Sequence, residues 1–460
     1  MKYTFSDLLF YLKNFLTTGQ ERSIIAKKNI LGSLIIKGLS IVISLVVVPL
    51  TLNYLNPSNY GIWLVLSSMV MWLSFFDIGF TQGLRNKFAV AKAKGDIQLA
   101  RSYISTAYYY ISIIFIIVWI VLFIVRKLVN WHSLLNIPIK DEQQISTLAV
   151  IILTYLCLQF VLRIINTVLI ADQNPAKSSF LDLLGQLISL VIIFLLTKFT
   201  KGSLIYLGLA VGISQIIVLV FGTLFLFNNK YKIYRPSFKY IKNEYAKDLL
   251  NLGIKFFVPQ IASIVQYQSA SFLIAHYFNT EQVTSYNIAY KYFFTLQMVF
   301  MILLTPLWSG VTDAYHKGDF TWIKNVVNKY LLVLVPFVLA GGFMLALSAQ
   351  VYDLWLGKNV IHIAFSISFL CYIYLSTFMF SSIFVSVING VGALTIQFVT
   401  SIVTSIGFIA LSMILIKRFH FGIEAILISI ILSNVYGFLI APIQYYKIFI
   451  KSSKSRIWYQ

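Results

Sequence analysis

Long apolar runs separated by short polar segments follow one another along almost the whole chain. Runs of this length predict helices that cross a membrane, because one crossing takes about 20 apolar residues. The predicted spans cover residues 30–55, 60–79, 102–125, 146–171, 178–197, 203–227, 249–278, 283–308, 330–350, 362–388, 393–416 and 422–446. The pattern therefore predicts an all-α membrane protein with twelve transmembrane helices.

The composition supports this fold class. Of the 460 residues, 59% are hydrophobic and only 11% are charged, and the mean hydropathy is +0.83. Soluble domains carry about 25% charged residues, so a water-soluble globule is excluded. The apolar runs are continuous and do not alternate in ten-residue segments, which argues against an outer-membrane barrel.

Polar and basic segments divide the chain into five parts. We predict a basic amphipathic segment at 1–28, a six-helix bundle at 29–227, a cytoplasmic linker at 228–248, a second six-helix bundle at 249–446 and a basic tail at 447–460. Five residue matches relate the bundles at an offset of 223 residues. Tyr54 and Asn56 recur as Tyr277 and Asn279, and the Lys-Gly-Asp at 94–96 recurs at 317–319. Two bundles with six helices each would be parallel repeats around a central cleft.

The charge distribution predicts the orientation. The chain holds 36 Lys and Arg against 15 Asp and Glu, a net charge of +21 that would suggest nucleic acid in a soluble protein. Here 24 of these cations fall on one side of the predicted topology and 8 on the other. Cytoplasmic loops accumulate Lys and Arg, so we expect no nucleic acid, both termini in the cytoplasm, and cytoplasmic loops at 80–101 and 309–329.

No catalytic or metal-binding pattern stands out. Cys157 and Cys371 lie inside apolar runs and are expected to be buried thiols. The five histidines lie in loops or near span ends, and no Gly-rich phosphate loop or zinc spacing occurs. We therefore expect neither an enzyme nor a bound metal or organic cofactor.

Four cations inside the predicted spans are the candidate binding residues, namely Lys37, Arg163, Lys255 and Lys291. A charge at the bilayer centre costs at least about 2.5–3.5 kcal/mol. Arg163 shares a helix face with Gln159, Asn166 and Thr167, which indicates a polar stripe facing a hydrated cavity. Lys37 and Lys255 have an alternative explanation, because lysines near span ends reach the headgroups.

Two carboxylates are candidates for ion pairing or proton binding, and two prolines are candidates for bending their helices. Asp182 lies on a polar face of the fifth span and is interpreted as a counter-ion or a proton-titrating site. Asp77 either pairs with a cation or caps the second span. Pro49 and Pro259 fall in the first span of each half, where proline frees carbonyls and bends helices.

Three motifs resemble a known family. They are PLTLNYLNPSNYGIW at 49–63, DIGFTQGLRN at 77–86 and KGD at 94–96. They resemble the N-terminal signature of Wzx-type O-antigen and polysaccharide flippases of the multidrug/oligosaccharidyl-lipid/polysaccharide (MOP) superfamily. The resemblance implies a MATE-like fold, with two six-helix bundles around a central cationic cavity, in the bacterial inner membrane.

The implied function is transfer of an undecaprenyl-diphosphate-linked oligosaccharide, an O-antigen or other surface polysaccharide repeat unit, to the periplasmic leaflet. The resemblance transfers no binding residues, so these rest on the pattern of this sequence: Lys37, Arg163, Lys255 and Lys291 would bind the diphosphate, and Asp77 or Asp182 would couple transport to H+ or Na+. Membrane lipids and polysaccharide assembly enzymes are the expected partners, and a monomer is the default. The alternatives are an ion-coupled drug or metabolite antiporter, which should prefer an acidic cavity, and a membrane-embedded glycan enzyme.

Overall fold

The described part of the chain is helical throughout. The computed structural model describes residues 21–71, 79–135, 142–172, 174–393, 395–451 and 458, and no strand occurs among them. The predicted N-terminal segment 1–28 lies mostly outside these residues, as does Asp77. The described helices form two compact units, which are treated separately below.

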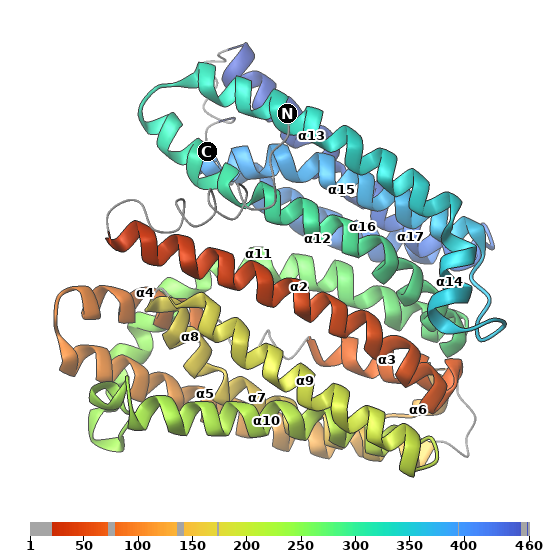
Figure 1. The fold of residues 1–460 in the computed structure, drawn as a ribbon, viewed down its shortest axis with the longest axis horizontal. Helices are drawn as coiled ribbons and strands as arrows, with labels where there is room; N and C mark the ends of the chain where they lie inside the picture. The colour runs from red at the N-terminus through yellow and green to blue at the C-terminus, as the bar shows by residue number, and fades with distance from the viewer. Residues whose placement is uncertain are drawn as a thin grey trace, which may run out of the picture. The chain divides into compact units, whose positions relative to one another are not determined.

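The first unit contains residues up to Leu50, 76–126 and 147–256. Helices α9 and α10 run side by side in it, and α4 packs against both α5 and α8 (Figure 1). Its helices are α2 (Glu21–Leu55), which runs past the unit's boundary, α4 (Phe80–Ala93), α5 (Ile97–Val125), α7 (Glu142–Leu162), α8 (Ile164–Ala171), α9 (Pro175–Phe199) and α10 (Leu204–Asn228), followed by the short turns η4 (Lys232–Tyr234) and η5 (Phe238–Tyr240).

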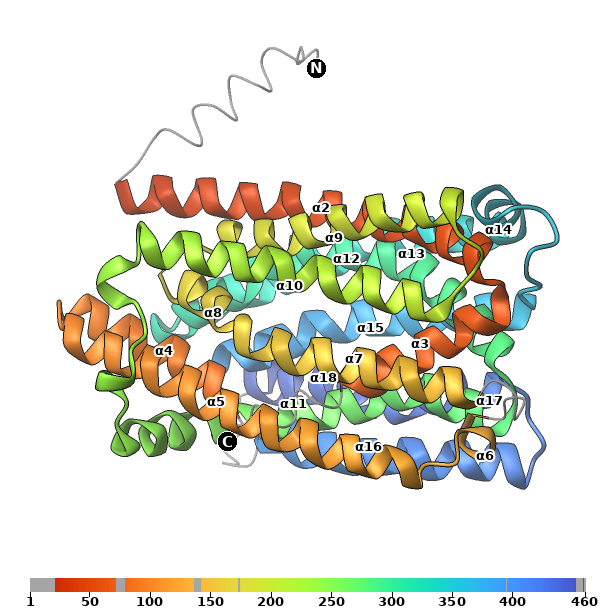
Figure 2. The same ribbon diagram turned by 90° about the horizontal axis from the view of Figure 1, so that it is seen from below.

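The second unit contains residues 51–75, 127–146 and 257–460. Helices α12 and α15 lie side by side in it (Figure 2). Its core gathers around these two helices, with Phe300, Ile383 and Val387 fully buried. Its helices are α3 (Pro57–Met71), α6 (Trp131–Leu135), most of α11 (Asn243–Tyr277), α12 (Thr280–His316), α13 (Phe320–Ala346), α14 (Ser348–Leu356), α15 (Phe365–Val391), α16 (Thr395–Lys417), α17 (Glu424–Ser433) and α18 (Ala441–Tyr445), with a short η2 turn (Arg126–Leu128) at its edge and π-helical turns η6 (Tyr436–Ile440) and η7 (Tyr446–Ile450).

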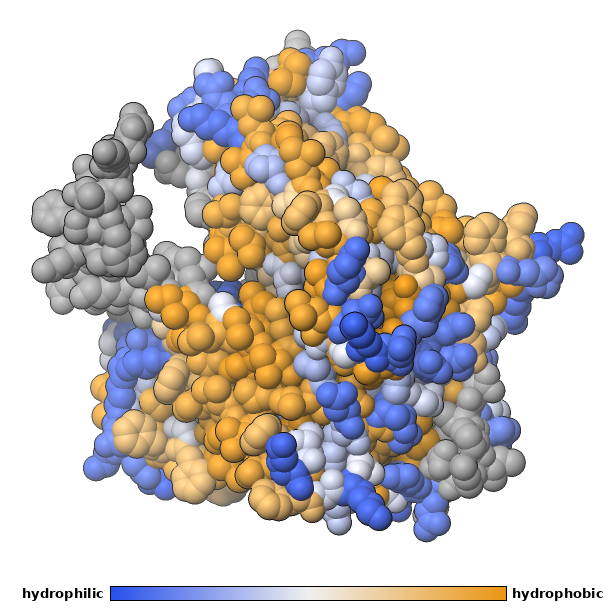
Figure 3. All heavy atoms as spheres, turned by 45° about the vertical axis from the view of Figure 1, so that its right-hand side comes forward, coloured by the Kyte–Doolittle hydropathy of each residue, from blue (hydrophilic) through white to orange (hydrophobic). Residues whose placement is uncertain are grey.

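Ten helical segments within the described residues are long and apolar enough to cross a membrane. Figure 3 shows a broad continuous area of hydrophobic side chains on one face, with hydrophilic side chains gathered in separate patches. The chain is therefore a multi-pass all-α membrane protein. The predicted spans at 60–79 and 249–278 are not among the ten, and both include residues or side chains that are not described, so twelve spans remain a prediction.

The two copies of the internal repeat have the same local geometry. Asn56 and Asn279 each accept a hydrogen bond from the backbone N–H three residues later, at 2.9 and 2.8 Å. In the second pair, Gly95 and Gly318 adopt φ values of 73° and 74°, which an L side chain disfavours. The next residues, Asp96 and Asp319, cap the following helices with 2.9 Å bonds. The repeated residues therefore begin and end equivalent helices.

Two predicted loops are wrong. Residues 80–93 form α4, whose Phe80, Leu84, Phe88 and Ala91 are buried at spacings of three and four residues. The basic residues between them lower the hydropathy but leave this helical period intact. The predicted 309–329 loop also shrinks to residues 317–319, because α12 and α13 extend to either side of it.

The thiol prediction is confirmed, since Cys157 and Cys371 are both buried and unpaired.

The fourth predicted span is divided at Arg163 into α7 and α8. In α2, the first unit ends at Leu50, one residue after Pro49. In α11, it ends at Phe256, three residues before Pro259.

Within the second unit, α3 and α12 meet at their N-terminal ends. Ser58 Oγ lies 3.0 Å from Thr280 Oγ1, and Thr284 Oγ1 donates to the Pro57 carbonyl at 2.7 Å. Gly61 faces the Thr280 backbone so closely that a Cβ would overlap its carbonyl oxygen. Close helix packing through small residues is typical of membrane proteins, where dispersion and hydrogen bonds drive association.

Gly61→Ala should therefore force α3 away from α12 and lower the apparent melting temperature in detergent. Overpacking of this kind costs about 1–3 kcal/mol. The matched control is Gly38→Ala in α2, where a Cβ would meet nothing within 4 Å. Equal melting temperatures for the two variants would contradict the close contact.

Candidate substrate-binding site

Arg163 occupies the turn between α7 and α8. Its backbone N–H donates to the Gln159 carbonyl at 2.8 Å, and its own carbonyl accepts from Asn166 N–H at 2.9 Å. The backbone therefore stays hydrogen-bonded while one helix ends and the next begins. The Arg163 side chain is 48% exposed although it lies within the candidate span Glu142–Ala171. Its guanidinium is thus partly accessible within a membrane-spanning segment.

Asp182 on α9 is the partner of Arg163. Asp182 Oδ1 lies 3.5 Å from Arg163 Nη2 and accepts a 3.4 Å hydrogen bond from Asn166 Nδ2. Asp182 is 35% exposed, whereas Asn166 is buried. The interpretation of Asp182 as a counter-ion thus has a geometric basis. Both contacts are long for charge-assisted hydrogen bonds, which are usually 2.7–2.9 Å.

Further amide groups line the interior of this unit. Gln186 follows Asp182 by one helical turn, and Gln215 on α10 lies where a Cβ on Gly185 would be. Among the described residues, the buried oxygens Asn166 Oδ1, Gln186 Oε1 and Gln215 Oε1 have no hydrogen-bond partner. A buried polar group without a partner costs about 1–3 kcal/mol. The unit therefore keeps hydrogen-bonding capacity in its interior that packing does not use.

The other predicted cations, Lys37, Lys255 and Lys291, are not described in one cluster with Arg163 and Asp182. Lys37 is exposed on α2 in the first unit, whereas Lys291 is half-buried on α12 in the second. Lys255 lies within α11, but its side chain is outside the described set. Asp77 also falls outside the described residues. Among the candidates whose side chains the structure describes, Arg163 and Asp182 are the two that pair.

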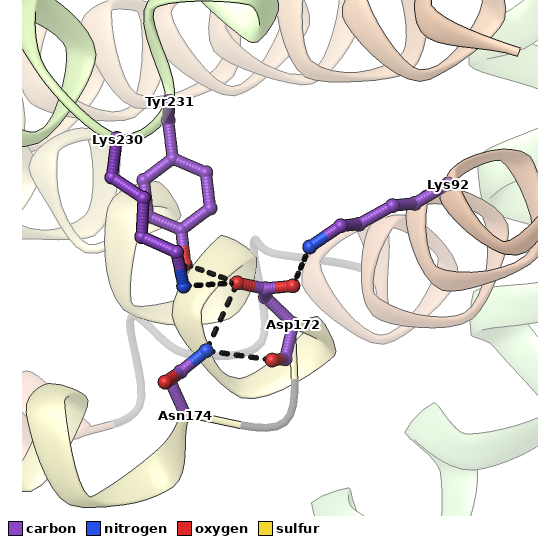
Figure 4. A network of polar contacts seen from close by, with 5 residues as sticks. All are labelled: Lys92, Asp172, Asn174, Lys230 and Tyr231. Atoms are coloured by element: carbon purple, nitrogen blue, oxygen red, sulfur yellow. Dashed lines mark hydrogen bonds and ion pairs between the residues drawn. The ribbon is translucent and has the colours of Figure 1, made fainter. Parts of the chain in front are cut away.

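Asp172, which sequence analysis missed, is the centre of a polar network of five described residues in the first unit (Figure 4). Its carboxylate accepts from Lys230 Nζ at 2.7 Å, from Tyr231 OH at 2.6 Å and from Asn174 Nδ2 at 2.9 Å, and it also pairs with Lys92. The side chain is only 8% exposed. This carboxylate ties together α4, the turn between α8 and α9, and the segment after α10.

The two lysines share that one buried carboxylate. Burial lowers the pKa of Lys92, and the nearby Lys230 ammonium lowers it further. Burial also lowers the pKa of Lys230. A polar loop residue between two spans gives little sequence signal, because its partners lie 80 and 58 residues away. The network is structural, since its groups satisfy one another.

A second ion pair fixes the start of α11. Asp248 accepts from Lys87 Nζ at 2.5 Å and from Tyr103 OH at 2.6 Å. Burial acts to raise the pKa of Asp248, but the hydrogen bonds from Lys87 and Tyr103 outweigh it and the net pKa lies below its ordinary value. The carboxylate therefore stays ionised and holds α11 against α4 and α5.

Comparison with known proteins now identifies the family. Residues 26–309, more than half of the chain, match the family described as polysaccharide biosynthesis protein. The chain belongs to this family. A Salmonella typhi protein named "Putative O-antigen transporter" is 22% identical over 339 residues, which are 72% of this chain and 74% of that protein. The resemblance predicted from the three sequence motifs is confirmed.

Solved structures of MATE family transporters share the fold of this polysaccharide biosynthesis protein. An inward-facing MATE transporter of the MOP superfamily aligns with a TM-score of 0.77 at 13% identity, covering 90% of this chain and 96% of its own. An outward-facing structure aligns with a TM-score of 0.62 at 14% identity, covering 94% and 97%. The predicted MATE-like fold is thereby confirmed.

Asp172→Asn should destabilise the first unit, because Lys92 and Lys230 lose the charge that both contact. Hydrogen bonds to charged groups contribute about 1.5–3 kcal/mol each, and partial exposure of both lysines reduces that loss. We expect a melting temperature several degrees below wild type in detergent. Asp353→Asn, at an exposed position on α14, is the control. If both variants melted like wild type, the network would have no structural role.

Proposed function

We propose that this family member translocates an undecaprenyl-diphosphate-linked oligosaccharide from the cytoplasmic to the periplasmic leaflet of the bacterial inner membrane. Its cargo would be an O-antigen or another surface polysaccharide repeat unit, moved by alternating access. It would act as a transporter and not as an enzyme. Family membership supports the polysaccharide precursor as the substrate class, and the O-antigen relative supports the transport step.

The observation that carries the proposal is the half-exposed guanidinium of Arg163 within a candidate span. One long contact to Asp182 leaves most of its five N–H donors available. A guanidinium fits phosphate oxygens in a two-point geometry. A diphosphate carries the charge that would displace Asp182, and the nearby amides offer polar contacts to a hydrated headgroup.

The physical task explains why such a site is needed. A diphosphate and many sugar hydroxyls cannot enter hydrocarbon without a large desolvation cost. In the proposed cycle, Arg163 binds the diphosphate while the lipid tail stays in the bilayer, and rearrangement of the helices then exposes the headgroup on the other side. Lys37 and Lys255 would assist on the cytoplasmic side, and Lys291 would receive the diphosphate near the opposite face.

Asp182 has a second proposed role. When the diphosphate displaces it from Arg163, its carboxylate becomes available to bind H+ or Na+, so substrate binding and ion binding would be coupled. Asp77 is a further candidate for this coupling. Pro49 and Pro259 would supply bends in α2 and α11 during the cycle, consistent with their position beside the boundaries of the compact units.

Contacts within each unit agree with the predicted alternation of the spans, because residues predicted to lie on the same side of the membrane contact one another. Lys92, Asp172 and Lys230 were all assigned to the cytoplasmic side, and they meet in one network. In the second unit, Lys417 lies over the Tyr277 ring at 5.5 Å, and both were assigned to the periplasmic side. From the excess of Lys and Arg in the loops on one side, we propose an inner-membrane monomer with both termini in the cytoplasm, working with membrane lipids and polysaccharide assembly enzymes.

Arg163→Ala should impair leaflet exchange of a lipid-linked oligosaccharide in proteoliposomes, measured by accessibility of the sugar to an external probe. Because a hydrogen bond to a charged group contributes about 1.5–3 kcal/mol, exchange at low substrate should fall at least about tenfold. Arg163→Lys should retain part of the rate, because it keeps the charge and loses the two-point geometry.

The matched control is Arg418→Ala, an exposed arginine after α16. Wild-type exchange by a folded Arg163→Ala protein would remove this residue from the site and leave the flippase proposal standing. Wild-type protein that exchanges no lipid-linked glycan, and instead drives efflux of a small organic cation with an ion gradient, would support the antiporter alternative.

Asp182→Asn should strengthen substrate binding and slow substrate release. The variant loses the carboxylate that competes with phosphate for Arg163, so the half-saturating substrate concentration should fall. The maximal rate should fall as well, because the competing group no longer assists release. The same proteoliposome assay at several substrate concentrations measures both. A higher half-saturating concentration would mean that Asp182 helps to bind substrate and does not compete with it.

A further inference from the structure

The segment after α10 is held against the rest of the first unit by hydrogen bonds. We call residues 229–242 the docked linker. Ser237 N–H donates to Ser105 Oγ at 3.1 Å, and Lys242 N–H donates to Thr106 Oγ1 at 3.2 Å. Arg101 Nε donates to the Arg235 carbonyl at 2.7 Å. These bonds fix the docked linker against the first turns of α5.

Aromatic side chains on the inner side of the docked linker pack against residues of α4 and α5. Tyr231 and Tyr234 are buried, and the Tyr234 ring packs edge-on against Phe88 of α4 with the centroids 5.3 Å apart. The Arg101 guanidinium lies 4.3 Å above the Tyr240 ring. The docked linker therefore has its own packing contacts, and its outward side chains are not needed to hold it in place.

The outer side of the docked linker combines apolar and basic residues. Ile233 is 52% exposed and Phe238 is 86% exposed. Lys232, Arg235 and Lys239 lie beside them and are also exposed. In the part of the chain that the structure describes, the ion pairs at this end use Lys230 and Lys242 and none of these three cations. A rigid segment thus presents a phenylalanine among unneutralised positive charges.

The attachment to α5 sets the depth of this surface in the membrane. Helix α5 has 29 residues and is about 43 Å long at about 1.5 Å per residue. The hydrocarbon core is about 30 Å thick, so several residues at each end of α5 extend beyond it. With α5 centred in the core, that boundary falls near Arg101, and Ser105 and Thr106 lie about one helical turn inside it. This places the docked linker, which is bonded to all three residues, at the boundary between headgroups and acyl chains.

We propose that the outer side of the docked linker binds the anionic phospholipid surface on its side of the membrane. Phe238 and Ile233 would insert at the boundary between headgroups and acyl chains, and Lys232, Arg235 and Lys239 would contact lipid phosphates. Aromatic and basic residues together are typical of such interfacial segments. This surface is separate from Arg163 and does not depend on the transported cargo.

A fluorophore at position 238 tests the proposal. Phe238→Cys, labelled with a polarity-sensitive dye, would react at one site because Cys157 and Cys371 are buried. In nanodiscs with phosphatidylglycerol, we expect blue-shifted emission and quenching by lipids that carry nitroxide near the headgroup. Neutralising Lys232, Arg235 and Lys239 to Gln should weaken the preference for anionic lipid by about fivefold per charge at low salt.

Lys94→Cys, exposed in the turn between α4 and α5 at the same end of the unit, is the matched control. Its dye should stay in water. The proposal is overturned if the dye at 238 behaves like the dye at 94, or if neutral and anionic bilayers give the same signal. It is also overturned if the charge dependence appears only after lipid-linked diphosphate is added. The signal needs no transport, so it stands or falls apart from the flippase assay.

Discussion

The hydrocarbon solvent is the constraint on which the rest of this structure depends. With no water to accept or donate hydrogen bonds, backbone groups must be satisfied within helices, and polar side chains must pair or cost free energy. At the ends of helices, Asn56, Asp96 and Asp172 satisfy N–H groups or lysines. Within a span, the pair of Arg163 and Asp182 stays partly exposed.

Asp172 and Asp182 differ in how much of their hydrogen-bonding capacity is used. Asp172 is almost fully buried and has four short contacts, so its hydrogen-bonding capacity is used. Asp182 has two long contacts, one of them to Asn166, whose own amide oxygen is buried without a partner among the described residues. A site that exchanges ligands must keep some capacity in reserve, and only the second carboxylate does so.

Much of the fold was predictable from sequence because hydropathy reports directly on the solvent. Most spans, the buried thiols and the matched helix ends of the repeat follow from apolar runs and from the special backbone needs of Gly and Asn. Helix α4 was missed because its basic residues outweigh four buried apolar ones in a hydropathy average. The packing of α3 with α12 and the partners of Asp172 depend on contacts distant in sequence, which a single sequence does not encode in any local pattern. At the candidate site, the polar stripe in the sequence predicted the polar neighbours of Arg163 on its helix face. It did not predict that the helix is interrupted at Arg163.

The repeated turns at Gly95 and Gly318 have a consequence for how such a protein changes over time. The two halves share the residues that start and stop helices, while the residues along the helix faces have diverged. Connections set where each helix enters and leaves the bilayer, and faces set what it contacts. A duplicated chain that preserves its connections is free to alter its interior. In such a chain, side chains along the helices are free to change as long as the turns at Gly95 and Gly318 still end one helix and begin the next.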